Sequence, residues 1–187
     1  SRDMMRYVEP EYLIPSHTRP IIGKEEIYQN LTTYRDGIQY VHDQTIRLMN
    51  LGMGPDDIAE SISLPKHLGD SPFLNEFYGT AEWSARNVFS GYLGWFDGNP
   101  STLKPLPKLE EANNLVTLAG GWNSLFKIAE ESYKDKEYQW ALQLTDYLLL
   151  TKPDNKEATI LRMSSLMALG EKESNPNSRY YYLSSAA

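Results

Sequence analysis

The sequence contains no cysteine and no long apolar run, and each absence excludes a class of protein. Its 187 residues hold no thiol, which excludes disulfide bonds, thiolate metal ligands and a cysteine nucleophile. No apolar segment approaches the roughly 20 residues that a membrane-spanning helix needs, so we expect no membrane span. Basic residues are also few, because 18 Lys and Arg stand against 25 Asp and Glu, a net charge of −7. This balance argues against a nucleic-acid partner, which needs a basic surface.

Histidine is scarce as well, and its spacing does not favour a metal site built from neighbouring residues. His17, His42 and His67 follow one another at intervals of 25 residues. Two imidazoles that share a metal ion from one helix or strand are only a few residues apart. The sequence also lacks the G-x-S-x-G, P-loop and dinucleotide-binding glycine patterns. Local motifs alone therefore assign no reaction.

Helical periodicity dominates what the sequence does contain. From Lys24 to about Asn50, apolar residues recur at alternating spacings of three and four, which indicates one face of a long helix. Further helices are predicted over 56–62 and 81–93. The apolar face of the long helix consists of Ile27, Leu31, Tyr34, Ile38, Val41, Thr45 and Leu48. Such a stripe has to be covered by later helices or by a second copy of the chain.

The last third of the chain has the pattern of helical hairpins. Apolar positions before and after Tyr138 resemble a tetratricopeptide-type hairpin that closes at 152–155, and a second, partial unit starts at Glu157. A repeat array needs about three units to be stable alone, so plain antiparallel hairpins are the alternative. With a short extended run at 12–15, the pattern predicts a mostly all-α fold with tetratricopeptide-like hairpins, preceded by a strand and a loop.

Several motifs carry a family resemblance. The loop from Pro15 to Pro20, with His17 at its centre, resembles the last metal-ligand loop of the metallo-β-lactamase superfamily. Later motifs are similar, in the same order, to the alkyl sulfatases of that superfamily. They are Tyr40-Val41-His42-Asp43, Tyr92-Leu93-Gly94-Trp95-Phe96-Asp97-Gly98-Asn99-Pro100, Leu118-Ala119-Gly120-Gly121 and Arg179-Tyr180-Tyr181-Tyr182-Leu183. Because this ordered set runs over nearly the whole chain, it is far more specific than any one motif.

The resemblance implies two parts and an activity. Residues 1–23 would be the tail of a metallo-β-lactamase domain, and residues 24–187 a helical alkyl sulfatase dimerisation domain. Such enzymes hold two zinc ions and hydrolyse alkyl sulfate esters to alcohol and inorganic sulfate. The His-x-His-x-Asp-His metal cluster of the family is absent from this sequence. We therefore expect a piece of a longer sulfatase that retains no zinc and is inactive alone.

The resemblance also suggests roles for residues in the loop from Pro15 to Pro20 and on the long helix. His17 matches a metal-ligand position. Arg19 could neutralise the sulfate group, since guanidinium suits tetrahedral oxyanions, although an ion pair that fixes the loop is equally compatible with it. His42 and Asp43 could hydrogen-bond to a metal-ligating residue and orient it, or could simply join two helices.

Two tryptophans mark a departure from the family pattern. Trp83 and Trp95 stand where primary alkyl sulfatases place a histidine and a tyrosine near the substrate sulfate. Both indoles would line an apolar wall of the substrate site, suited to a secondary or bulkier ester, unless they are core residues.

The implied partners are an alkyl sulfate ester and a second copy of the chain, paired isologously. The resemblance favours a periplasmic or secreted location over a cytoplasmic one. A stand-alone tetratricopeptide-like interaction module is an alternative, but it gives no reason for the His17 loop. A metallo-β-lactamase-family hydrolase of another ester would share the fold without the sulfate specificity.

Overall fold

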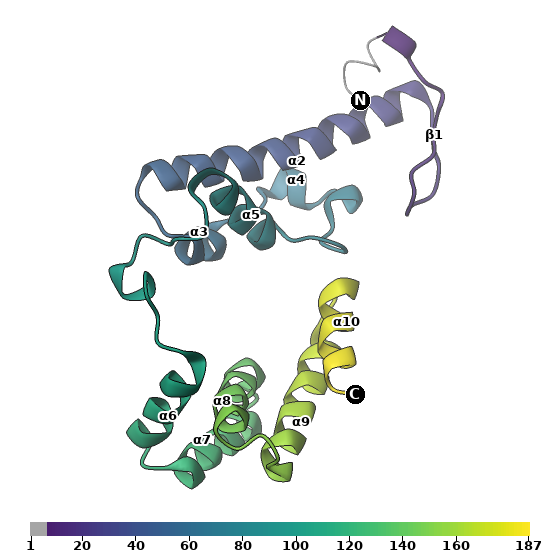
Figure 1. The fold of residues 1–187 in the computed structure, drawn as a ribbon. Helices are drawn as coiled ribbons and strands as arrows, with labels where there is room; N and C mark the ends of the chain where they lie inside the picture. The colour runs from purple at the N-terminus through teal and green to yellow at the C-terminus, as the bar shows by residue number, and fades with distance from the viewer. Residues whose placement is uncertain (1–6) are drawn as a thin grey trace. The chain divides into compact units, whose positions relative to one another are not determined.

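A computed structural model describes residues 7–187 and divides them into two units that meet in the sequence at Asn99 and Pro100. Within these residues there are nine α-helices and one two-stranded sheet (Figure 1). The predicted all-α class is therefore confirmed. The likeness to tetratricopeptide hairpins and the domain boundary between residues 23 and 24 stay predictions. Residues 1–6, part of the predicted N-terminal segment, lie outside the described residues.

The first unit begins with a short β-hairpin. Strand β1 (Tyr12–Leu13) pairs antiparallel with β2 (Ile21–Ile22), with Leu13 opposite Ile21. The intervening residues 14–20 form the connecting loop, so His17 and Arg19 lie at its tip. Ile21 is buried against Ile27 at the start of the next helix, which fixes the base of the hairpin.

Helix α2 (Lys24–Asn50) has the predicted bounds. It starts directly after Gly23, whose φ of 104° is readily adopted only by glycine. Two glutamates in its first turn and Arg47 in its last turn complement the helix dipole. The sequence signals at both ends therefore account for its length.

The apolar stripe of α2 is covered at its two ends and open in its middle. Ile27 is buried near the hairpin, and Val41 and Leu48 are buried in a second cluster with residues of α3 and α5. On the same face between them, Tyr34 is 51% exposed and Ile38 is 58% exposed. Helices α3 and α5 cover the stripe only over the later half of α2 (Figure 1).

Shorter elements complete the first unit. They are α3 (Pro55–Ser61), α4 (Lys66–Gly69), a 3-10 turn (Pro72–Leu74) and α5 (Ala81–Leu93). Helices α3 and α5 confirm the predicted helices, whereas α4 and the 3-10 turn lie between them, where no helix was predicted. Leu74 packs so closely on α2 that a Cβ added to Gly37 would lie 2.9 Å from its Cδ1.

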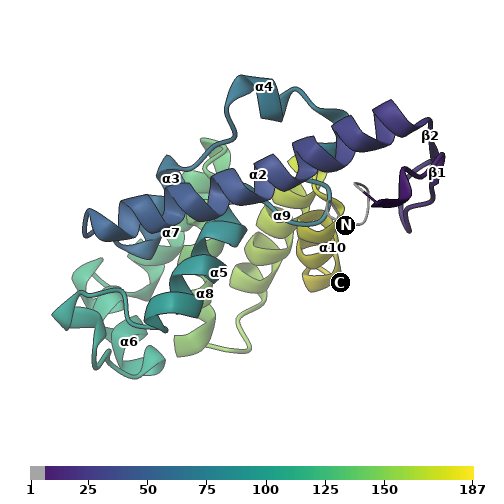
Figure 2. The same ribbon diagram turned by 90° about the horizontal axis from the view of Figure 1, so that it is seen from above.

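The second unit consists of five helices. They are α6 (Lys108–Leu118), α7 (Trp122–Lys134), α8 (Tyr138–Thr151), α9 (Lys156–Lys172) and α10 (Pro176–Ser185). From α7 onward each helix packs against the next, and α6 packs mainly against α8; Figure 2 shows the same helices from above. Leu125, Leu144 and Leu148 form the centre of the core. The α7–α8 hairpin was predicted, and α9 corresponds to the start of the second, partial unit, while α6 and α10 were not predicted.

Candidate functional site: the His17 loop and the start of α5

The tip of the hairpin meets the segment that leads into α5. The imidazole ring of His17 lies with its centroid 5.2 Å from that of the Tyr78 ring, at a tilt of 41°. Tyr78 precedes α5 by only a few residues. The structure thus brings the predicted metal-ligand residue to the start of the helix that carries Trp83. Tyr78 was not predicted as a site residue, because a contact between distant segments leaves no periodic signal.

The first turn of α5 is held by two side chains. The Thr80 hydroxyl accepts a hydrogen bond from the backbone N–H of Trp83 at 3.0 Å, and Glu76 Oε1 accepts one from the N–H of Ala81 at 2.7 Å. Both N–H groups would otherwise lack a partner at a helix N-terminus. The backbone that carries Trp83 is therefore fixed, while its indole is 38% exposed. A Thr three residues before Trp83 is the sequence signal for this cap.

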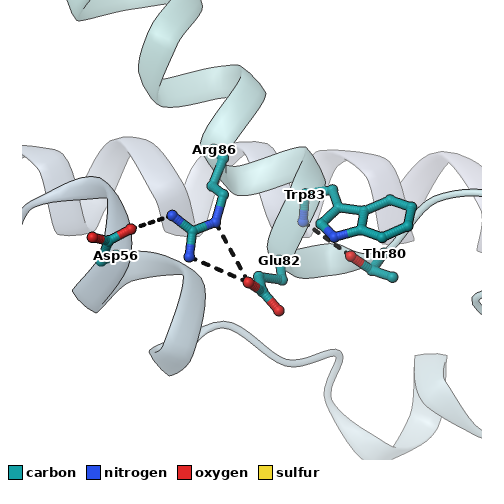
Figure 3. Close-up of polar contacts among 5 residues, drawn as sticks. All are labelled: Asp56, Thr80, Glu82, Trp83 and Arg86. Atoms are coloured by element: carbon teal, nitrogen blue, oxygen red, sulfur yellow. Dashed lines mark hydrogen bonds and ion pairs between the residues drawn. The ribbon is translucent and has the colours of Figure 1, made fainter. Parts of the chain in front are cut away.

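Arg86 ties α5 to α3. Its guanidinium donates to Asp56 of α3 and to Glu82 one turn earlier on α5 (Figure 3). The hydrogen bond with Asp56, more than that with Glu82, raises the pKa of Arg86 above its ordinary value. Figure 3 shows the Trp83 indole on the side of α5 away from Asp56. The arrangement leaves the indole side of α5 free of this ion-pair network.

Trp95 does not share the position of Trp83. It follows the C-terminal end of α5 at Leu93, which is about 15 Å along the helix axis from Trp83 at 1.5 Å per residue. Its side chain is 74% exposed. Among residues 7–187, the only aromatic ring that its indole contacts is that of Phe96. Neither tryptophan is a buried core residue. Arg19 is exposed in the same loop as His17.

His42 and Asp43 form a bridge between helices. His42 Nδ1 lies 3.0 Å from Asp43 Oδ1, and His42 Nε2 lies 3.1 Å from the Tyr92 hydroxyl on α5. The hydrogen bond from His42, followed by one from Gln39, holds the pKa of Asp43 below its ordinary value. The contacts connect α2 with α5, and whether they also orient a metal ligand stays a prediction.

The residues described here do not fit a two-zinc centre. A catalytic zinc site generally uses three protein ligands for each ion. Among residues 7–187, no group of three His, Cys, Asp or Glu side chains is placed to hold a metal ion. His17 approaches an aromatic ring rather than other ligands.

None of the helices within residues 7–187 is long and apolar enough to cross a bilayer.

Comparison with known proteins identifies close relatives along the whole chain. The family described as alkyl sulfatase dimerisation matches residues 54–187. A linear primary-alkylsulfatase from a Pseudomonas strain is 40% identical over 187 residues, which is 100% of this chain and 35% of that protein. Alkyl/aryl-sulfatase BDS1 of Saccharomyces cerevisiae is 32% identical over 173 residues, or 92% of this chain and 27% of that protein.

Solved structures give the same result. The stereoselective inverting sec-alkylsulfatase Pisa1 from a Pseudomonas species is similar with a TM-score of 0.93 at 29% identity, and the match covers 99% of this chain and 30% of that one. The chain thus spans about a third or less of the length of these relatives. The family match over most of its residues, the 40% identity and the helical fold together show that this chain belongs to the alkyl sulfatase dimerisation family.

Proposed function

We propose that this chain acts as the dimerisation part of an enzyme that hydrolyses alkyl sulfate esters to alcohol and inorganic sulfate. The observation that carries this proposal is the 40% identity, along the entire chain, to a linear primary-alkylsulfatase. The relatives include an alkyl/aryl-sulfatase and an (R)-specific secondary-alkylsulfatase. A sulfate ester with an alkyl chain is the substrate class that these names have in common.

Within this enzyme, the loop of residues 14–20 would contribute to the reaction centre. His17 would supply one metal ligand, and the remaining ligands would not come from residues 7–187. Arg19, two residues away, would pair with the sulfate group, because a guanidinium can donate to two of its oxygens at once. Trp83, on the helix that follows Tyr78, would offer an apolar surface to the alkyl group.

A sulfate-release assay on the full-length gene product tests the proposed activity. We expect inorganic sulfate to be released from dodecyl sulfate, and at least about tenfold less phosphate from dodecyl phosphate, which carries an additional charge at neutral pH. Ion chromatography measures both anions. If no alkyl sulfate of any chain length is cleaved, the proposed activity is wrong.

The dimer contact would include the open middle of α2. Tyr34 and Ile38 lie on the same helix face as buried residues, and the described residues of the first unit leave them more than half exposed. Two copies of α2 crossing about a two-fold axis that passes between Tyr34 and Ile38 would place Tyr34 of each copy opposite Ile38 of the other, as an isologous contact requires. The family description supports pairing with a second copy rather than with an unrelated protein.

Sedimentation equilibrium across a concentration series measures this association. We expect the chain to form dimers, and Ile38→Asp to weaken dimerisation about tenfold or more, because a carboxylate would have to lose its hydration in the contact. Leu118→Asp is the matched control, since Leu118 is 84% exposed in the other unit. A strictly monomeric mass at high micromolar concentration would contradict self-association, and equal effects of the two variants would contradict the role of α2.

A further inference from the structure

A cleft in the unit of residues 100–187 has no role in the proposed function. It lies between the start of α8 and the end of α9, and its volume is about 440 Å³. Sites for small organic ligands commonly have volumes of roughly 300–1,000 Å³. The unit that contains this cleft is not the one that contains His17 and Trp83.

Part of the lining is apolar and aromatic. Tyr138 and Trp140 come from the first turn of α8, and Leu169 comes from the last turns of α9. The Trp140 side chain is 44% exposed, although burial of an aromatic ring is normally favourable. Gln139 is held at one side by the Tyr182 hydroxyl, which donates to its Oε1 at 3.5 Å. The cleft therefore offers an accessible apolar surface on which an alkyl chain could lie.

The remaining lining carries more positive than negative charge. Lys136 and Lys172 both line the cleft, against the single carboxylate of Glu137. The ammonium of Lys172 lies 4.5 Å from the centroid of the Tyr138 ring, a cation–π geometry that holds it over the cleft. The ion pairs found among residues 7–187 involve neither of these lysines. Two ammonium groups are thus available to an anion.

We propose that this cleft is a second binding site for a singly charged anionic amphiphile, a linear alkyl chain that ends in a sulfate-like head. The tail would lie against Trp140 and Leu169, and the head would lie between Lys136 and Lys172. A neutral alcohol would form an ion pair with neither ammonium group, and inorganic sulfate would leave the apolar surface in water. Only a ligand with both parts satisfies the two halves of the lining. The site goes beyond the proposed reaction, because it binds the amphiphile without cleaving it.

Isothermal titration calorimetry on the 187-residue chain tests the site with octane-1-sulfonate, kept below its micellar concentration. Its carbon–sulfur bond is not an ester bond, so sulfate-ester hydrolysis does not interfere. We expect saturable binding with one site per chain, weakened about fivefold by Lys172→Gln and by Lys136→Asn. Asn is chosen at position 136 because its φ of 68° is left-handed. Glu137→Gln is expected to tighten binding about twofold, and added salt to weaken it.

Several comparisons decide the outcome. Lys156→Gln is the matched control, because Lys156 lies at the opposite end of α9 from Lys172; it should leave the affinity unchanged. Trp140→Ala should weaken binding at least about fivefold through the lost apolar area. Octanoate, which also has one negative charge and a linear alkyl tail, should bind with an affinity similar to that of the sulfonate. Octan-1-ol and inorganic sulfate, which each lack one of these two parts, should bind at least about tenfold more weakly.

The site is refuted if octane-1-sulfonate shows no saturable binding, or if the lysine variants bind it as tightly as the parent chain. Thermal unfolding of each variant checks that a lower affinity does not result from a less stable fold. We expect the lysine variants to keep their stability, because both lysines are exposed. Because the sulfonate is not a substrate, this failure would leave sulfate release by the full-length enzyme unaffected. Failure of the proposed activity would equally leave the binding result standing.

Discussion

Sulfate release from dodecyl sulfate is expected to stay at background when the 187-residue chain is purified alone. Catalytic zinc sites use about three protein ligands, and among residues 7–187 no three candidate ligands come together. His17 alone would bind zinc weakly, as an isolated exposed imidazole does. After dialysis, mass spectrometry for zinc is expected to find much less than one ion per chain, and ion chromatography to find no sulfate above the blank.

His17→Ala supplies the matched variant for this result. In the isolated chain it should change neither the trace zinc content nor the background rate, because residues 7–187 do not form a complete site even with His17 present. Stoichiometric zinc that disappears in His17→Ala would show instead that the chain builds a metal site of its own. An alkyl sulfatase of known activity, assayed in parallel, shows that the conditions support turnover.

Leu148→Ala is expected to lower the free energy of unfolding of the second unit by about 3 kcal/mol, within the range of roughly 2–5 kcal/mol for buried leucines. Leu148 is completely buried, and its side chain packs among residues of α7, α8 and α9. Removal of three carbon atoms there would leave a cavity that the surrounding helices cannot fully close. Urea unfolding, followed by tryptophan fluorescence, measures the change, and Trp122 contributes a local signal because its indole N–H donates to the Leu148 carbonyl at 3.2 Å.

Leu150→Ala makes the same chemical change two residues later on α8. Its side chain is 40% exposed, so we expect a loss of less than about 1 kcal/mol. A similar loss for the two variants would mean that Leu148 is not at the centre of the core. Because the chain has two units, unfolding should be fitted with separate transitions where the probes differ.

The sequence predicted those helices that bury a regular apolar stripe. The long helix α2 and helices α5, α8 and α9 each bury residues at helical spacing, and turn residues mark most of their ends. Helix α6 buries only Ala112, and α10 buries only Ser178. A helix that buries one small residue gives almost no periodic signal, so both were missed. Their position depends on tertiary packing, such as the contact of Leu183 with Gly170.

The candidate site was predictable only in part for a related reason. Residues within one motif, such as His17 and Arg19, could be placed in the same loop from the sequence, while their roles stay predictions. The contact of His17 with Tyr78 and the bridge from Arg86 to Asp56 each join segments far apart in the chain. Spacing in the sequence does not encode such contacts. The placement of Trp83 near the start of α5 and of Trp95 beyond its end likewise follows only once the helix bounds are known.

The segment that joins the two units has a consequence for how this family can vary. Every side chain from residue 98 to residue 111 is exposed, and the only helical structure in 98–107 is a 3-10 turn at Pro100–Thr102. Each hydrophobic cluster draws all its residues from one side of this segment. A chimaera that joins two relatives near residue 100 would therefore inherit each core intact from a single parent. Recombination at this point could exchange the His17 loop and the α8–α9 cleft independently between sulfatases.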